Sequence, residues 1–354
     1  MFSNLRSLIF KLDPETAHNL AIKSLKFNFV PNILDEDKNN PLFSTKLFEK
    51  NLENPIGMAA GFDKNAEVYN SLFKLGFGFV EVGTITPLKQ YGNPKPRVFR
   101  LVEDEALINR LGFNNIGAKN IIDRIKKNKP SGLLGINIGP NKDTLDKVND
   151  YIECFKIFYE VADYITINIS SPNTENLRNF HDQIKLDELL QTLNKEKKNL
   201  KKTPIAVKIS PDINDKEISK ISEVLLNNKI DAIIVSNTSD STRDNLKNIQ
   251  SHQKGGLSGK PIELKSTKLI NKFYKILNGK IIIIGVGGVD SGKSVYEKII
   301  NGANLVQLYT GMIYKGPNVV EKINQELINI LKTKGIKNIS EAIGIKNWPW
   351  RRSL

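Results

Sequence analysis

The order of apolar and amphipathic segments is the feature of this sequence that most restricts its fold. Short runs rich in β-branched residues cover 55–60, 79–84, 133–138, 164–170, 204–209, 232–237, 280–286 and 304–309. Segments of helical periodicity separate most of them, for example 66–75, 118–127, 217–227 and 291–301. Eight such units predict a parallel (β/α)8 barrel. A doubly wound open sheet is the alternative, but the first run lacks the G-x-G-x-x-G turn typical of that fold.

Composition restricts the classes of function. The single cysteine, Cys154, excludes a disulfide framework and any metal or iron–sulfur site built on several cysteines. The histidines His18, His181 and His252 are too scattered for a metal cluster, so we expect no metal site. The net charge of +14 suits an anionic partner, such as a phosphorylated small molecule. A lysine-rich, solvated surface is the simpler interpretation of the same charge.

Residues 1–40 stand outside the alternating pattern. We expect two short amphipathic helices there, and Asp13-Pro14-Glu15 is a favourable start for the second. No run reaches the ~18 apolar residues of a membrane-spanning helix, and no signal-peptide pattern is found, so an intracellular setting is expected. The pattern alone allows either a helix pair packed on the barrel or a membrane-facing element. Residues 346–354 form a tail to which no role is assigned.

Polar groups follow the predicted strands, where barrels of this type place their active sites. Small, hydroxyl, amide and ammonium groups stand at each strand end, which a purely structural barrel does not need. The residues at the strand ends, among which Phe62 and Asp63 accompany these groups, include Ala60, Gly61, Phe62, Asp63, Lys64, Thr84, Asn137, Asn168, Ser171, Asn173, Lys208, Ser236, Asn237, Thr238, Gly288, Tyr309 and Thr310. A single asparagine is more often a turn residue bonded to its own backbone. Several amides together with two lysines favour a planar, polar, anionic ligand.

Glycine turns and a buried lysine point to an anion more directly. Glycines follow the seventh and eighth predicted strands, and 255–259 adds a further flexible turn. Barrels commonly bind phosphate at such turns through backbone N–H groups. Lys208 lies within the apolar run "PIAVKIS", where an ammonium is costly unless it meets an anion. The alternative is a strand end exposed to solvent.

Longer stretches match a known family. They include "NPIGMAAGFDKN", "INRLGFNN", "INISSPNTENLR", "IAVKISPD" and "IIGVGGVDSG", and they run in order through most of the chain. In these stretches the chain resembles the dihydroorotate dehydrogenases, and more closely their quinone-dependent, membrane-associated class 2. The resemblance implies a flavin mononucleotide (FMN) cofactor and oxidation of (S)-dihydroorotate to orotate, in pyrimidine biosynthesis. It also implies that Ser171 is the catalytic base. The class 1 enzymes have cysteine at that position, so the serine itself favours class 2.

The resemblance implies two sets of ligands by position. The FMN set is Ala60, Gly61, Phe62, Asp63, Lys64, Thr84, Asn137, Asn168, Lys208, Ser236, Gly259, Gly288, Tyr309 and Thr310. The substrate set is Lys64, Asn109, Arg110, Leu111, Gly112, Phe113, Asn168, Asn173, Asn237 and Thr238. Thr174 or a bound water is a candidate relay for the proton taken by Ser171. Asn176 stands where the family usually has glycine.

The resemblance also implies a role for residues 1–40, as a helical domain that admits quinone from the membrane to the flavin. His18, Arg100 and Tyr309 are the candidate polar groups on the quinone side, and Arg100 is the better supported. Residues 41–345 would form the FMN-binding barrel. We expect a monomer in peripheral contact with the lipid bilayer, on the cytoplasmic side of a bacterial inner membrane.

Two other functions fit the sequence less well. Another FMN barrel, such as a tRNA dihydrouridine synthase, would be expected to have a cysteine proton donor and a helical RNA-binding domain. Cys154 instead lies in a run of helical periodicity that predicts a core position. A basic nucleic-acid-binding module would leave the strand-end residues unexplained and lacks a basic–aromatic platform. No nucleic-acid partner is therefore expected.

Overall fold

Eight parallel strands close into a barrel in the computed structural model, which describes residues 2–27, 40–174, 176–197, 200, 203–241 and 243–347. The barrel strands are β3 (Ile56–Met58), β4 (Phe79–Ile85), β7 (Leu133–Ile138), β8 (Tyr164–Asn168), β9 (Ile205–Ile209), β10 (Ala232–Val235), β12 (Ile282–Val286) and β13 (Leu305–Leu308). They follow chain order around the barrel, and β13 closes the ring by pairing with β3. Each strand overlaps one of the predicted runs, so the predicted (β/α)8 barrel is confirmed.

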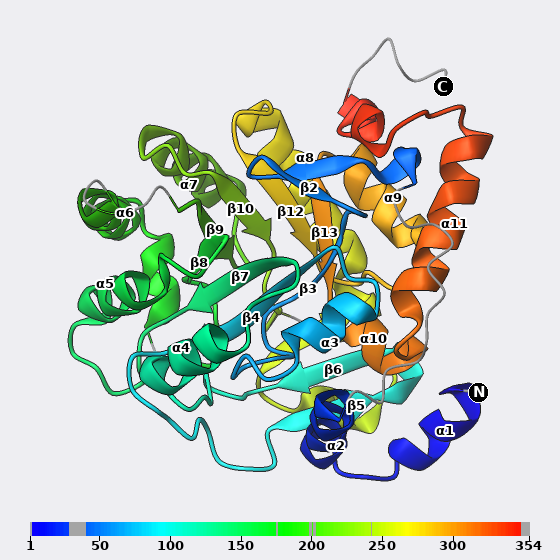
Figure 1. Ribbon diagram of the computed structural model, residues 1–354, viewed down its shortest axis with the longest axis horizontal. Coiled ribbons are helices and arrows are strands. Elements are labelled where there is room, and N and C mark those ends of the chain that lie inside the picture. Colours follow the sequence, from blue (N-terminus) through cyan, green and yellow to red (C-terminus); the bar gives the residue numbers. More distant parts are fainter. Residues whose placement is uncertain are drawn as a thin grey trace.

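Helices surround the barrel (Figure 1). They are α3 (Tyr69–Lys74), α4 (Ala118–Lys127), α5 (Lys147–Phe158), α6 (Gln183–Lys197), α7 (Asp215–Asn227), α8 (Glu263–Leu277), α9 (Gly292–Ile300), α10 (Thr310–Lys315) and α11 (Val319–Thr333). Short 3-10 helices are η1 (Pro41–Phe43), η2 (Val102–Asp104), η3 (Leu177–His181), η4 (Ile249–His252), η5 (Lys260–Ile262), η6 (Ile339–Ala342) and η7 (Ile345–Asn347). The predicted helix 66–75 is shorter in the structure, because Ala66 has a φ of 51° and cannot continue a right-handed helix.

Two small sheets, which the sequence analysis did not predict, cover the ends of the barrel. The hairpin of β1 (Thr45–Leu47) and β2 (Lys50–Leu52) packs Leu47 and Leu52 on Phe79 and Tyr164, at the amino ends of the barrel strands. A three-stranded antiparallel sheet, the rim sheet, consists of β5 (Val98–Leu101), β6 (Ala106–Asn109) and β11 (Gly256–Gly259). The expectation of a flexible turn at 255–259 is therefore wrong, because pairing with β6 makes most of that segment a strand.

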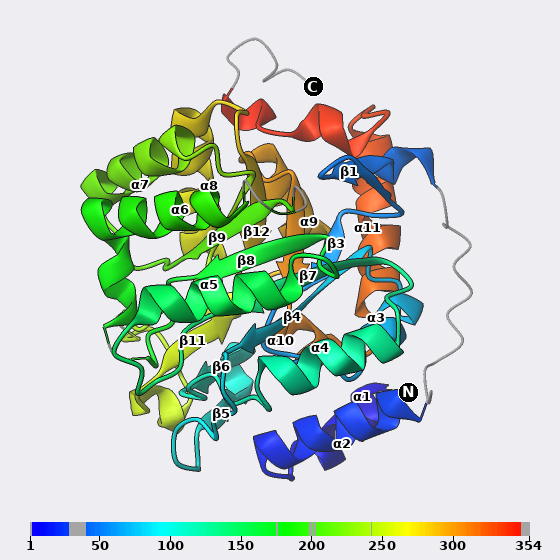
Figure 2. The same ribbon diagram turned by 60° about the vertical axis from the view of Figure 1, so that its left-hand side comes forward.

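The N-terminal helices α1 (Phe2–Ile9) and α2 (Pro14–Lys26) lie against the rim sheet and α10, away from the β1–β2 hairpin (Figures 1 and 2). The predicted start of α2 is confirmed, because the Asp13 carboxylate accepts a hydrogen bond from the Thr16 N–H at 2.9 Å. Among the described residues, no helix has both the length and the apolar character needed to cross a membrane. Residues 28–39 of the predicted N-terminal domain 1–40 lie outside the described residues, as do residues 348–354 of the predicted tail 346–354.

Candidate active site

The carboxyl ends of the barrel strands and the rim sheet enclose a cavity of about 110 Å³, which we call the rim cavity. Most of the predicted site residues line it: Ala60, Gly61, Lys64, Thr84, Asn109, Leu111, Gly112, Phe113, Asn168, Ser171, Asn173, Lys208, Asn237, Thr238 and Tyr309. Val98, Leu107 and Ser258 of the rim sheet complete its wall and were not predicted. The fold therefore brings residues from widely separated segments of the chain to one place.

A second cavity of about 70 Å³, the glycine cavity, shares Lys208, Asn237 and Tyr309 with the rim cavity. The predicted residues that line it are Ala60, Lys208, Ser236, Asn237, Thr238, Gly259, Gly288, Tyr309 and Thr310. Gly288 has a φ of 74°, and a Cβ on it would lie 2.4 Å from the Cβ of Glu263. Only glycine fits there. The turn lies close to Glu263 at the start of α8, and the N-terminus of a helix is a favourable position for an anion.

A network of side-chain hydrogen bonds fixes the amides at the strand ends. Asn168 donates from Nδ2 to Thr84 Oγ1 at 2.9 Å and to Asn137 Oδ1 at 3.2 Å. Asn237 donates from Nδ2 to Asn168 Oδ1 at 3.3 Å. Asn137 lies beneath the two small cavities and does not line them. These asparagines are held by one another across neighbouring strands, which orients their remaining polar atoms for a ligand.

The two serines after β8 have different environments. Ser170 is fully buried, and its hydroxyl donates to Asn168 Oδ1 at 3.0 Å and accepts from Asn237 Nδ2 at 2.9 Å. Ser171 lines the rim cavity, and its Oγ accepts from the Asn173 N–H at 3.2 Å. The Ser171 hydroxyl is therefore the one of the two that can exchange a proton with a molecule in the cavity.

The turn that follows Ser171 carries the candidate relay residue. Thr174 is buried, but no hydrogen bond joins it to Ser171 within the described part of the chain. Asn176 adopts the left-handed conformation with a φ of 57°. Asparagine tolerates this conformation better than most side chains, so it can stand where the related enzymes have glycine.

Lys208 is a buried cation without a close partner. It is 5% exposed and lines both small cavities, and its ammonium makes no hydrogen bond or ion pair among the described residues. Burial lowers the pKa of Lys208, and the Glu81 carboxylate opposes that shift. Because a buried ammonium without a partner is costly, the site favours a ligand with negative charge beside Lys208.

Glu81 is a buried site residue that the sequence analysis did not identify. Inside the barrel its carboxylate accepts hydrogen bonds from Asn137 Nδ2 at 2.8 Å, from the Tyr164 hydroxyl at 2.9 Å and from Gln307 Nε2 at 3.0 Å. It therefore holds Asn137 in place from below. The available signal was an acidic residue within the otherwise apolar run "FVEVGT", since an unpaired carboxylate is rarely buried.

Lys64 is the second cation of the site. Its ammonium donates to the Gly61 carbonyl at 2.7 Å. Burial lowers the pKa of Lys64 to about 8, and the nearby Glu15 carboxylate opposes this shift while the Arg97 guanidinium adds to it. A cation with this pKa loses its charge within the range of ordinary assay conditions.

Besides Asn137, three further predicted ligands do not line either small cavity. Phe62 and Asp63 line the larger cavity beside α2 instead. Asp63 is buried and accepts from the N–H groups of Glu67 and Val68, both at 2.7 Å, so it holds the turn that precedes α3. The Arg110 guanidinium donates to Gln253, Lys254 and Pro96 outside the cavities. The resemblance had included these residues as members of the contiguous segments 60–64 and 109–113, whose other residues line the small cavities.

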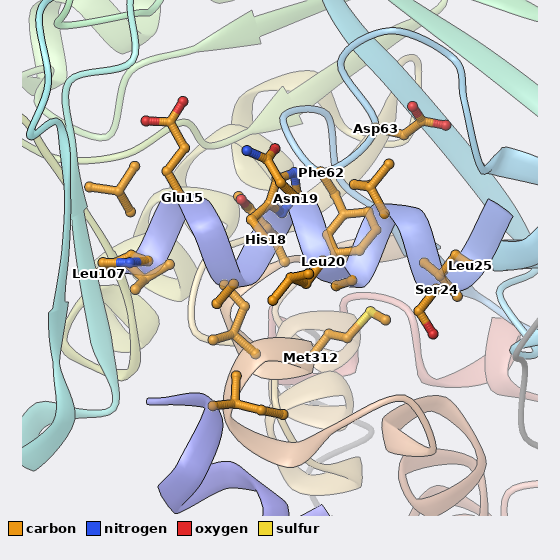
Figure 3. Close-up of a pocket in the computed structure, with 18 of the residues that line it drawn as sticks. Glu15, His18, Asn19, Leu20, Ser24, Leu25, Phe62, Asp63, Leu107 and Met312 are labelled. Carbon is orange, nitrogen blue, oxygen red and sulfur yellow. The ribbon is translucent and has the colours of Figure 1, made fainter. Parts of the chain in front are cut away.

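A cavity of about 500 Å³, the apolar cavity, lies between α2 and the barrel (Figure 3). Its wall is mostly aliphatic and aromatic, with Leu20, Phe62 and Met312 among the lining residues. Lys64, Val98, Leu107, Leu111 and Tyr309 line both this cavity and the rim cavity. The two spaces are therefore neighbours separated by a thin wall of shared side chains.

The predicted quinone-side groups are placed differently around the apolar cavity. His18 lines it and packs edge-on against Phe62, with ring centroids 5.2 Å apart, and burial lowers the pKa of His18 to about 3. Arg100 also lines it, and donates to the carbonyls of Phe10 and Leu12 at 2.9 and 3.0 Å, beyond the end of α1. His18 is thus a neutral ring, whereas Arg100 is a cation that also anchors α1.

Comparisons with known proteins agree with this geometry. Residues 42–331 match the family model of dihydroorotate dehydrogenase. The chain is 46% identical to the dihydroorotate dehydrogenase (quinone) of Bartonella tribocorum, over 95% of this chain and 94% of that protein. It is also 46% identical to the enzyme of the same name from Buchnera aphidicola, over 91% of this chain and 98% of that protein.

A solved structure shows that the similarity includes the three-dimensional fold. The crystal structure of DHODH from Eimeria tenella in complex with ferulenol superimposes with a TM-score of 0.91 at 39% identity. The match covers 95% of this chain and 96% of the Eimeria chain. On sequence and structure together, the chain belongs to the dihydroorotate dehydrogenase family, in its quinone-dependent class.

Proposed function

We propose that this protein oxidises (S)-dihydroorotate to orotate and passes the electrons to a membrane quinone, as a step of pyrimidine biosynthesis. The observation that carries the proposal is the adjacency of two unlike cavities that share Lys64 and Tyr309. The polar rim cavity suits a planar, charged substrate, and the apolar cavity suits a quinone ring and its isoprenoid chain.

FMN is the cofactor that fits the strand-end residues. The Gly288 turn, with Ser236, Gly259 and Thr310 around it, suits the phosphate. Lys208, whose ammonium has no hydrogen bond or ion pair among the described residues, would supply a cation beside the ring. When bound, FMN supplies the hydride acceptor that the amino-acid side chains lack. Phe62, Asp63 and Arg110 are omitted from the proposed ligands, because their side chains lie elsewhere.

Dihydroorotate has a carboxylate and a ring with carbonyl and N–H edges, and the rim cavity offers complementary groups. Lys64 would bind the carboxylate as a cation. The amides that would bind the ring edges are Asn109, Asn168, Asn173 and Asn237, with the Thr238 hydroxyl beside them. Leu111, Gly112 and Phe113 would form the wall over the ring. Binding by fixed groups orients the substrate, which supplies much of the catalysis.

Ser171 would remove the proton from C5 of the substrate while the hydride leaves C6. A serine hydroxyl is a weak base, so the proton must pass onward. Thr174 or a water is the proposed acceptor of that proton. Ser170 would keep Asn168 and Asn237 in position.

The apolar cavity would admit quinone from the lipid bilayer, with Arg100 and Tyr309 as its polar contacts. Leu5, Leu8 and Leu20 on the N-terminal helices are exposed, as is Phe27 directly after α2. Exposed apolar side chains on short amphipathic helices favour peripheral contact with a membrane surface. We place the protein, as a monomer, on the cytoplasmic side of a bacterial inner membrane.

One experiment tests the proposed function. The purified protein should be yellow, should bleach without oxygen when dihydroorotate is added, and should regain its colour when a quinone analogue follows. A colourless protein would refute the cofactor assignment. A yellow protein that dihydroorotate does not bleach would refute the substrate, and bleached protein that only a soluble acceptor restores would refute the quinone.

A further inference from the structure

A buried ion pair ties the first turn of α2 to the barrel. Arg97 donates from Nε to Glu15 Oε2 at 3.1 Å and from Nη2 to Glu15 Oε1 at 2.6 Å. The Arg97 and Glu15 side chains are 7% and 13% exposed. A two-pronged arginine–carboxylate pair of this kind fixes direction as well as distance. Glu15 thereby determines where the Arg97 guanidinium lies.

The remaining nitrogen of Arg97 holds the turn at 91–93. Nη1 donates to the Tyr91 carbonyl at 2.6 Å and to the Asn93 carbonyl at 2.9 Å. Between them, Gly92 has a φ of 77°, and a Cβ on it would lie 2.1 Å from the Leu111 carbonyl oxygen. The turn therefore lies directly against the 110–112 segment.

The side chain of Asn93 extends the chain of contacts to the rim cavity. Its Nδ2 donates to the Arg110 carbonyl at 3.0 Å and to the Asn173 carbonyl at 3.4 Å. Its backbone N–H donates to the Leu111 carbonyl at 3.0 Å. Leu111 and Asn173 both line the rim cavity. Asn93 thus joins two substrate-side segments that are distant in sequence.

We propose that Glu15 is a positioning residue for the substrate, acting through Arg97 and the 91–93 turn on Leu111 and Asn173. The N-terminal helix α2 then serves the dihydroorotate side of the protein as well as the quinone side. This inference rests on the proposed function. Electrostatics acts in the same direction: the Glu15 carboxylate opposes the burial that lowers the pKa of Lys64 to about 8, so it helps Lys64 remain a cation.

The test is Glu15→Gln in the full-length, FMN-loaded protein. We expect the Kd of orotate and the KM of dihydroorotate to rise about tenfold, because Arg97 loses its charge partner in a buried place. Glu15 also lines the apolar cavity, so the KM of a quinone analogue should rise as well, but by less than the Kd of orotate. Lys95→Gln is the matched control, since Lys95 lies 3.6 Å from the same carboxylate but is 64% exposed; its orotate Kd should stay at the wild-type value.

A second pair of variants separates positioning from general loss of structure. If Glu15 acts through the turn, Asn93→Ala combined with Glu15→Gln should raise the orotate Kd by less than the product of the single effects. Independent effects would overturn the proposal, as would an unchanged orotate Kd in Glu15→Gln with only the quinone KM raised. If Glu15→Gln does not fold, Arg97→Lys takes its place, with the same expected rise and the same overturning result.

Measurements on the wild-type protein distinguish a failure of the proposed function from a failure of the proposed role of Glu15. Failure of dihydroorotate to bleach the wild-type protein would refute the proposed function. Normal bleaching of the wild-type protein, with unchanged orotate binding in the Glu15→Gln variant, would refute only the role of Glu15.

Discussion

The rim cavity and the apolar cavity are neighbours, but the first is lined by fixed polar groups and the second mostly by apolar side chains. The rim cavity takes its polar groups from the ends of barrel strands, where Asn168 and Asn237 fix each other by hydrogen bonds. The apolar cavity is about 500 Å³ against about 110 Å³ and has a wall contributed by α2, which packs on the barrel from outside. Chemistry on a polar substrate needs fixed donors and acceptors, whereas a long apolar molecule needs space and a route from lipid.

The shared wall is where the difference matters most. Lys64 and Tyr309 face both spaces, so a change there should affect both partial reactions. Changes deeper in one cavity should affect a single partial reaction. Separate measurements of bleaching with dihydroorotate and recolouring with quinone therefore test whether each cavity serves one partial reaction.

The largest effect is expected for Ser171→Ala. Loss of the proposed base should slow bleaching by dihydroorotate by about 10²–10⁴-fold, while the recolouring rate with quinone stays the same. Stopped-flow absorbance measures both rates, and the orotate Kd serves as a control for an intact cavity. An unchanged bleaching rate would show that another group takes the C5 proton.

A smaller effect, on the binding of orotate, should come from the pH-dependent charge of Lys64. The pKa of Lys64 is about 8, so the cation is present below that pH and is lost as the pH rises through it. The Kd of orotate should therefore rise above pH 8, by up to about tenfold for each pH unit. Titrations from pH 6 to 10 measure this. Lys64→Met should bind weakly at every pH, and the same pH dependence in that variant would assign the effect to another group.

The smallest effect should come from Arg100→Gln, which removes a cation from the apolar cavity and its bonds to the carbonyls of Phe10 and Leu12. We expect the KM for quinone to rise roughly three- to tenfold, with bleaching by dihydroorotate unchanged. Steady-state assays with quinone and with a soluble dye distinguish the two. An equal loss with both acceptors would contradict the separation of the cavities.

Sequence patterns predicted the barrel well because hydrophobic periodicity is local. Each apolar run overlaps one barrel strand, and Asp13 begins α2 as expected. The rim sheet was missed because its strands are short and β11 is half glycine, so its pairing with β6 is visible only in space. Phe62 and Arg110 were grouped with the site by adjacency, although a side chain next in sequence to a site residue can face elsewhere.

The sequence by itself determined the fold class, the family and most of the residues that line the rim cavity. Strand periodicity and family motifs are patterns of residues that lie close together in the sequence, so both can be recognised without the structure. The resemblance had already selected Ser171, but only the tertiary structure decided that Ser170 is buried beside Asn168, that Glu81 supports Asn137 from inside the barrel, and that Glu15 reaches Arg97. These facts depend on contacts between segments far apart in the sequence, such as the 82 residues between Glu15 and Arg97, and such contacts exist only once the chain has folded.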